Sequence, residues 1–223
     1  MASVDRQPWD FGRFLQTLTF FETFPFLRWI RKMFFGSTPP PPPQPLAGQL
    51  FDFTQADATV KATWGALDDV VMGGVSTSTI QLQAEGALFT GNVSTANSGG
   101  FASIRTRNFE PPLNVSGYSG LELQVKGDGQ RYKFLIRDAD SWDSLAYSYS
   151  FDTVANQWTI IRIPFALMVP VFRAKTVTNA PELNRDRIYS LQLMLSKFEY
   201  DGALNPQFSP GEFQLLIRTI AVY

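Results

Sequence analysis

Two adjacent carboxylates and two adjacent glycines lie close together in the segment 64–76, WGALDDVVMGGVS. Asp68 and Asp69 could hold a metal ion, and Gly73 and Gly74 could form a loop that binds phosphate. The same residues could instead serve only the fold, because glycine tolerates unusual backbone conformations and carboxylates accept hydrogen bonds from backbone N–H groups. The neighbouring sequence favours one of these three functions.

Phosphate binding is disfavoured by the residues that follow the glycines. A glycine-rich phosphate loop lies between a strand and a helix. After Gly74 the chain reads VSTSTIQLQ, which is rich in β-branched residues and alternates with a period of two. This pattern predicts a strand.

Calcium binding is disfavoured as well. Neighbouring side chains of an extended backbone point to opposite faces, so Asp68 and Asp69 would not converge on one ion. A second acidic segment, DADSWD at 138–143, lacks the glycine and the distal glutamate of a helix–loop–helix calcium site. We therefore expect no metal ion and no cofactor.

An architectural function is favoured for the segment 64–76. Gly73 and Gly74 would allow a positive φ or a close backbone approach, and Asp68 and Asp69 would accept hydrogen bonds from N–H groups or an arginine. The apolar residues would fill an edge of the core: Trp64, Val70, Val71 and Met72. A contact with a partner protein through the same loop stays open as an alternative.

The composition excludes several kinds of enzyme. The chain has 223 residues and contains no histidine and no cysteine. Disulfides, thiolate nucleophiles and serine–histidine catalysis are therefore excluded. Paired carboxylates could hydrolyse glycosides, but nothing in the sequence sets the separation between any two of them. We expect no catalytic residues and a protein that is not an enzyme.

Nucleic acid is not an expected partner. Residues 46–223 contain 14 basic and 17 acidic residues, a difference of −3. Basic and aromatic residues interleave in RYKFLIR at 131–137, but no basic stripe extends beyond it. We expect Arg131, Lys133 and Arg137 to form the solvent-facing side of a strand.

Three aromatic residues near the acidic segment 138–143 are candidates for binding a carbohydrate: Trp142, Tyr147 and Tyr149. Sugar sites combine aromatic rings with polar neighbours, here Asp138, Asp140 and Asp143. Strand alternation places Tyr147 and Tyr149 on one face with Leu145 and Phe151, and such a face is more often part of a core.

The elements that would position these residues are short β-strands. Ile80 and Leu82 alternate with polar residues, as do Leu121, Leu123 and Val125. The turn KGDG at 126–129 predicts a hairpin between the strands on either side of it. Further strands are expected at 87–92, 101–106, 145–151, 157–163, 188–197 and 212–222. About ten short strands without a long helix predict an all-β sandwich or jelly roll.

The composition divides the chain into three parts: an amphipathic segment 1–35, a proline-rich linker 36–45 and a β domain 46–223. Asp10 is the expected N-cap of a helix that Pro25 interrupts. Its apolar stripe is Phe11, Phe14, Leu15, Leu18 and Phe21, and a second stripe holds Phe26, Leu27, Trp29, Ile30 and Phe34. Arg28, Arg31 and Lys32 lie on the side opposite the second stripe.

The charges interrupt this segment too often for a membrane span. They also fit neither a signal peptide nor an import presequence. The pattern is typical of a helix lying in a membrane interface, with basic residues at anionic headgroups. The alternative is docking on its own domain or on a partner. The proline run 39–43 favours a stiff polyproline II spacer of roughly 25 Å.

Five motifs together resemble the complex I intermediate-associated protein 30 family: DDVVMGGVS (68–76), GGFASIRT (99–106), GLELQVKGDG with its following Arg and Tyr (120–132), QWTIIRIPF (157–165) and GEFQLLIRTIAVY (211–223). The resemblance covers about 50–223. It implies a β-sandwich like that of galactose-binding domains and a function as a transient, non-enzymatic partner in assembling respiratory complex I. Related domains in cyanobacteria and plastids are linked to photosystem biogenesis.

Together these features indicate an assembly factor or scaffold tethered through residues 1–35, with subunits or intermediates of a membrane complex as partners. The amphipathic segment suggests a bacterial or cyanobacterial protein. We expect a peripheral membrane protein on the cytoplasmic or stromal face of a plasma or thylakoid membrane. A carbohydrate-binding module of galactose-binding-like fold is the alternative.

Overall fold

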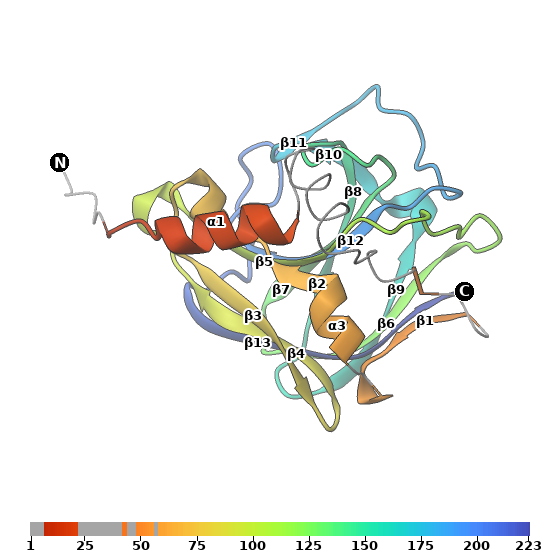
Figure 1. Ribbon diagram of the computed structural model, residues 1–223, viewed down its shortest axis with the longest axis horizontal. Coiled ribbons are helices and arrows are strands. Elements are labelled where there is room, and N and C mark those ends of the chain that lie inside the picture. The colour runs from red at the N-terminus through yellow and green to blue at the C-terminus, as the bar shows by residue number, and fades with distance from the viewer. Residues whose placement is uncertain (1–6, 22–41, 44–47, 56–57) are drawn as a thin grey trace, which may run out of the picture.

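Two antiparallel β-sheets pack against each other in the computed structural model of the chain, which describes residues 7–21, 42–43, 48–55 and 58–223 (Figure 1). The first sheet contains β1 (Gln49–Asp52), β3 (Thr77–Gln83), β4 (Gly86–Val93), β6 (Gly120–Lys126), β9 (Trp158–Pro164) and β13 (Gly211–Val222). The second contains β2 (Trp64–Ala66), β5 (Phe101–Thr106), β7 (Arg131–Arg137), β8 (Ala146–Asp152), β10 (Val169–Phe172), β11 (Lys175–Thr176) and β12 (Ser190–Ser196). The predicted all-β sandwich is confirmed.

β13 is the central strand of the first, six-stranded sheet, whose order is β3-β4-β13-β6-β9. One edge of β13 pairs with β4 and then with β1, and the other edge pairs with β6. The second, seven-stranded sheet has the order β11-β10-β8-β7-β12-β5-β2. Both sheets therefore consist mainly of strands that are distant in the sequence.

The core lies between the two sheets and follows the predicted alternation. In β6 the side chains of Leu121, Leu123 and Val125 are fully buried, while the residues between them are partly exposed. Facing residues of the second sheet include Phe134 of β7 and Leu193 of β12, both with no exposed surface. Burial of such side chains is the main source of stability in a sandwich of this kind.

The predicted hairpin at KGDG is wrong. β6 pairs with β9 and β13, whereas β7 pairs with β8 and β12, so residues 127–130 cross from one sheet to the other. Asp128 holds this crossing, because its carboxylate accepts hydrogen bonds from the hydroxyl of Tyr132 and the N–H of Gln214, both at 3.0 Å. The turn residues specified a change of direction but not which strands pair after it.

The prediction that the cations of β7 face solvent is also wrong in part. Their side chains do lie on the outer face of the seven-stranded sheet, but residues 197–205 cover much of that face. Lys133 is only 2% exposed, and its Nζ donates to the carbonyl oxygens of Phe198 and Glu199. Strand alternation identifies the face on which a residue lies but not what covers that face.

Two α-helices and four short 3₁₀ helices complete the described part of the chain: α1 (Phe11–Phe20), α3 (Ala58–Thr63), η1 (Phe53–Gln55), η2 (Asp69–Met72), η3 (Ala96–Ser98) and η4 (Phe165–Leu167). Figure 1 shows α1 lying along one side of the sandwich, where it contacts β2 and η2. Within the described ranges, every helix is too short or too polar to cross a lipid bilayer.

The second apolar stripe of the amphipathic segment lies outside the described residues, as do its basic residues and nearly all of the linker 36–45. Their membrane and spacer functions therefore stay predictions. The first stripe is described from Phe11 to Phe21.

Candidate functional site

Residues 64–76, here called the signature loop, join the two sheets at one end of the sandwich. The loop runs from β2 through η2 to β3, so it leaves the seven-stranded sheet and enters the six-stranded one. Asp68 and Asp69 lie at its middle, and each is only 1% exposed. Such buried carboxylates must find hydrogen-bond donors, since an unpaired buried charge is strongly destabilising.

Asp69 finds four donors. Its carboxylate accepts hydrogen bonds from the N–H and hydroxyl of Ser76 at 2.9 and 2.7 Å and from the N–H groups of Gly100 and Phe101 at 2.7 and 3.3 Å. Ser76 immediately precedes β3, and Phe101 begins β5. Asp69 therefore connects the starts of two strands that belong to different sheets.

Asp68 makes an equivalent connection one step further along the same strands. It accepts hydrogen bonds from the N–H and hydroxyl of Ser78 at 2.9 and 2.6 Å, from the N–H of Ser103 at 3.0 Å and from Nη2 of Arg13 at 3.0 Å. Ser78 lies in β3 and Ser103 in β5. These are the contacts expected of an architectural loop, namely backbone N–H groups and an arginine.

The electrostatics of Asp68 are set mainly by its burial, which raises the pKa of this carboxyl from 3.8 to about 6. Hydrogen bonds from Ser78 and Ser103 and the positive charge of Arg13 act in the opposite direction and lower the pKa. The carboxylate therefore depends on its donors to remain ionised at neutral pH.

The two glycines of the loop have different functions. Gly73 ends η2 with φ +90°, a left-handed conformation that favours glycine. A Cβ atom on Gly74 would lie 2.3 Å from Cγ of Asp69, so the absence of a side chain there lets the carboxylate approach the backbone. Both reasons given by the sequence, a positive φ and a close approach, occur in the loop.

The apolar residues of the loop are divided between the core and the surface. Trp64 and Val70 are each 2% exposed, and Val71 is half-buried. Met72 is 76% exposed, so the prediction that it fills the core edge is wrong. A 3₁₀ helix of four residues can bury only one side, and here Val70 occupies that side.

The loop does not gather a metal site. Within the part of the chain that the structure describes, no three side chains of the metal-binding types come together. The carboxylates of Asp68 and Asp69 instead accept hydrogen bonds from N–H and O–H groups. Their oxygens are therefore used within the protein.

Helix α1 docks on the signature loop. Asp10 caps the helix as predicted, accepting a hydrogen bond from the N–H of Arg13 at 3.0 Å. Besides its contact with Asp68, Arg13 donates through Nη1 to the carbonyl of Ser76 at 3.1 Å. Nε1 of Trp9 donates to the carbonyl of Val70 at 2.8 Å. The predicted alternative, docking of the segment on its own domain, thus applies to its first half.

The docked face of α1 includes only part of the predicted apolar stripe. Thr17 is buried, and the ring of Phe20 packs on Gly65, where a Cβ atom would lie 2.4 Å from that ring. On the other side, Phe11 is 56% and Leu15 is 46% exposed, with Trp9 beside them at 43%. Phe14, Leu18 and Phe21 are half-buried.

The three candidate carbohydrate-binding residues are not brought to one surface. Tyr147 is 2% exposed and donates its hydroxyl to the carbonyl of Pro181 at 3.0 Å, while Tyr149 packs against the core. Trp142 is half-buried on the opposite face of the sheet, where its ring lies 5.3 Å from that of Phe21. The burial of the tyrosines fits the core interpretation.

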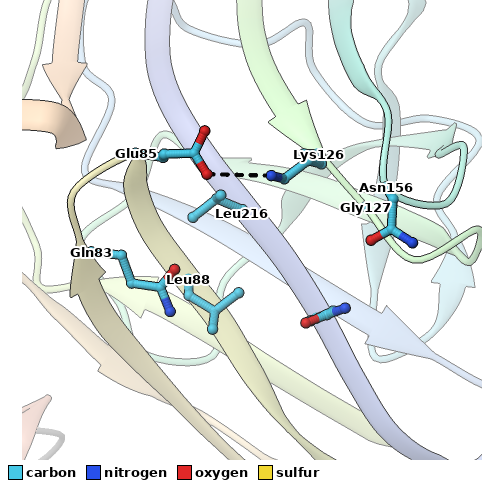
Figure 2. A pocket seen from close by; sticks show the side chains of 8 residues that line it. Gln83, Glu85, Leu88, Lys126, Gly127, Asn156 and Leu216 are labelled. Atoms are coloured by element: carbon cyan, nitrogen blue, oxygen red, sulfur yellow. Dashed lines mark hydrogen bonds and ion pairs between the residues drawn. The ribbon is translucent and has the colours of Figure 1, made fainter.

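A pocket of about 200 Å³ lies at the surface of the six-stranded sheet. Its lining includes Gln83, Glu85 and Leu216, and Figure 2 shows Glu85 facing Lys126, with the carboxylate and the ammonium group 3.4 Å apart. Because these two charged groups neutralise each other, the pocket presents no uncompensated charge to a ligand. None of the predicted site residues lines it.

Comparison with known proteins identifies the family. Residues 51–217 match the family described as complex I intermediate-associated protein 30. The chain belongs to this family. An uncharacterized protein of the fission yeast Schizosaccharomyces pombe is 30% identical over 184 residues, which is 75% of this chain and 81% of that protein. The family match over residues 51–217 covers the signature loop and most of the sandwich.

Solved structures of similar fold include carbohydrate-binding modules. The family 11 module of a cellulosomal cellulase of Clostridium thermocellum has a TM-score of 0.53 and 16% identity, over 77% of this chain and 92% of that one. The same module in complex with a β-1,3-1,4-mixed-linked tetrasaccharide has a TM-score of 0.52, with 78% and 94% covered. At such low identity the likeness shows the fold alone, and it confirms the galactose-binding-like sandwich.

The sequence predicts the kinds of partner that Asp68 and Asp69 have but not which residues supply them. Ser76 and Ser78 are two residues apart, so they lie on the same face of one extended segment, and this spacing was the available signal. Ser103 and Gly100 occur in the motif 99–106, but nothing in the sequence connects them to Asp68 and Asp69. Arg13 lies between apolar residues of the helix stripe and was not predicted to contact the domain.

Replacing Arg13 by alanine is expected to lower the free energy of unfolding by about 1–3 kcal/mol at neutral pH, because Asp68 then loses a charged donor. The folded pKa of Asp68, about 6, lies above the unfolded value of 3.8, so the native protein takes up a proton as the pH falls through 6. The cost of Arg13→Ala should therefore be largest above pH 6, fall as Asp68 of the native protein takes up its proton, and be mostly lost well below pH 6.

Urea denaturation of both proteins across this pH range measures the effect. Gln16→Ala, on the exposed side of α1, is the matched control and should change stability by less than about 0.5 kcal/mol. A cost for Arg13→Ala that is equal at both ends of the pH range would show that Arg13 does not act through Asp68.

Proposed function

We propose that this protein is a non-catalytic assembly factor or scaffold for a membrane protein complex, either a complex I of the respiratory type or a photosystem. The observation that carries the proposal is the match of residues 51–217 to a family described by its association with complex I intermediates. Subunits or assembly intermediates of that complex would be the partners. The absence of histidine and cysteine from the sequence supports a binding function over a catalytic one.

Residues 1–35 would tether the protein to the membrane. Support comes from the outward side of α1, where Trp9, Phe11 and Leu15 are each more than 40% exposed although the helix is docked. Exposed aromatic residues of this density are typical of a surface that meets lipid or another protein. The predicted second stripe, with Arg28, Arg31 and Lys32, would extend this surface. The protein would then be peripheral, on the cytoplasmic or stromal side.

The docking of α1 gives this tether a definite relation to the β domain. Trp9 and Arg13 bond to the signature loop, so the outward apolar face of α1 is fixed beside that loop. A membrane or client that binds this face would meet the same end of the sandwich each time. This arrangement favours a scaffold that presents one end of its β domain to a nascent complex.

A double variant, Phe11→Ser with Leu15→Ser, tests the proposal better than deletion of residues 1–35, because it leaves the docking contacts of Trp9 and Arg13 in place. Deletion would also remove Arg13 and leave the buried carboxylate of Asp68 without its charged partner. The full chain is expected to float with vesicles that contain anionic lipid and to co-purify with an immature membrane complex. The double variant is expected to lose about tenfold in both assays, since about 1.4 kcal/mol of binding energy suffices for that change.

The matched control replaces two exposed apolar residues of the β domain, Ile160→Ser and Leu167→Ser, which are 59% and 61% exposed. It should bind as the full chain does. A double variant of α1 that floats and co-purifies normally would contradict the tether. A full chain that co-purifies with no membrane complex would contradict the assembly function.

A further inference from the structure

Two arginines lie next to each other on the outer face of the seven-stranded sheet. Arg105 of β5 is opposite Gln192 of β12, and Arg137 of β7 is opposite Ser190 of the same strand. Both side chains therefore flank β12 on one face. Arg105 is 2% exposed, whereas Arg137 is partly accessible from solvent.

The hydrogen-bond partners of Arg105 are all neutral. Its guanidinium donates to the hydroxyl of Ser190 at 3.2 Å, to the carbonyl of Trp142 at 3.3 Å and, more weakly, to the side-chain oxygen of Asn108 at 3.5 Å. The ring of Trp142 lies 5.3 Å from the guanidinium carbon. These contacts orient the group without neutralising its charge.

Arg137 has fewer hydrogen-bond partners than Arg105. Its Nη1 donates to Oε1 of Gln192 at 2.7 Å, but its Nε is buried and has no hydrogen-bond partner. Within residues 7–21, 42–43, 48–55 and 58–223, neither guanidinium forms an ion pair. Asp143 attracts Arg137 from a distance, but its own ion pair is with Arg173.

The neighbouring cations on this face, Lys133 and Arg131, have carboxylate partners that compensate their positive charge. Lys133 donates to two carbonyl oxygens and lies 4.0 Å from Glu199. Arg131 bonds to Glu199 at 3.0 Å and to Asp152 at 2.6 Å. Among the basic residues of β5 and β7, Arg105 and Arg137 are therefore the two without a carboxylate partner in the described part of the chain.

Leaving both guanidiniums without a counter-charge is costly. Burial lowers the pKa of Arg105 well below its usual value, and the charge of Arg137 lowers it further. Burial also lowers the pKa of Arg137, to about 10. A fold can keep such a pair when an anion compensates the charge in the functional state.

We propose that Arg105 and Arg137 form a binding site for a small ligand that carries an oxyanion, either a phosphate or a carboxylate group. Arg137 is the partly accessible member of the pair, its Nε has no partner in the described chain, and its guanidinium is a planar fork of N–H donors that matches two oxygens of such a group. Arg105 lies deeper and supplies the second charge, while Trp142 borders the site. This site is distinct from the signature loop and goes beyond the proposed assembly function.

Thermal unfolding and calorimetry of the full chain test the site. Inorganic phosphate and malonate are added separately at about 10 mM, against sodium chloride of equal ionic strength. At least one anion is expected to raise the unfolding temperature by about 3–6 °C and to give a saturable isotherm. A stronger effect of phosphate identifies a phosphate group as the ligand's anion, and a stronger effect of malonate identifies a carboxylate.

Arg137→Gln should weaken binding at least tenfold, because it removes the charge and the fork. Arg137→Lys, which keeps the charge but not the planar fork, provides the same test if the glutamine variant fails to fold. The control is Arg162→Gln, an arginine of β9 that is 67% exposed and paired with Glu122, and it should bind as the full chain does. Absence of binding by both anions, or equal binding by the Arg137 and Arg162 variants, would overturn the proposal.

Discussion

Replacing Asp69 by alanine is expected to lower the free energy of unfolding by about 3–5 kcal/mol, a large part of the stability of a domain of this size. The substitution leaves the N–H groups of Ser76 and Gly100 buried without an acceptor, and it disconnects β3 from β5. Each buried donor left unsatisfied costs about 1–3 kcal/mol. Urea denaturation followed by circular dichroism measures the loss.

Asp201→Ala is the matched control for this prediction. Asp201 also accepts two hydrogen bonds, from the N–H and hydroxyl of Thr176 at 3.0 and 2.7 Å, but it lies at the surface. In Asp201→Ala, water can accept the hydrogen bonds that the N–H and hydroxyl of Thr176 donate to Asp201. The loss in free energy of unfolding should therefore stay below about 1 kcal/mol. Equal losses for the two variants would mean that Asp69 does not link the sheets.

Replacing Gly74 by valine is expected to cost at least about 3 kcal/mol, because the new Cβ would lie 2.3 Å from Cγ of Asp69. The carboxylate cannot retreat without losing its bonds to Ser76 and Gly100. Thermal or urea unfolding measures the cost. Complex co-purification with the same variant shows whether function falls together with stability.

Substitutions at two other glycines, Gly73 and Gly117, are the controls for Gly74→Val. Gly73→Ala should cost about 1 kcal/mol, because its φ of +90° disfavours any side chain although the space around it is empty. Gly117 has neither a positive φ nor an atom within 4 Å of a new Cβ, so Gly117→Val should be close to neutral. If Gly74→Val abolished co-purification at unchanged stability, the loop would be a partner contact and not a fold element.

Much of the β domain could be predicted from alternation alone. Apolar residues at every second position fix which side of a strand faces the core, as Leu121, Leu123 and Val125 show. The chemistry of Asp68 and Asp69 was also predictable, because adjacent carboxylates beside glycines and without metal-binding neighbours have few other uses. Local sequence determines such local properties.

The sequence could not predict which strands pair or which segments cover the outer face of a sheet, because both depend on residues far away in the sequence. The turn KGDG leads from one sheet to the other, since β13 and β12 compete successfully for the strands beside it. Lys133 is buried by residues 197–205, more than sixty positions away. The pair Arg105 and Arg137 arises only because β12 brings two separate strands together.

The position of β13 has a consequence for how the chain folds during its synthesis. Its partners β1, β4 and β6 all precede it, so they leave the ribosome with their shared neighbour still missing. Closing such long loops is slow, and unpaired strand edges invite wrong associations until it happens. The aspartate contacts, which span only residues 68–103 apart from Arg13, can form much earlier. They would keep β3 and β5 together while the nascent chain waits for its central strand.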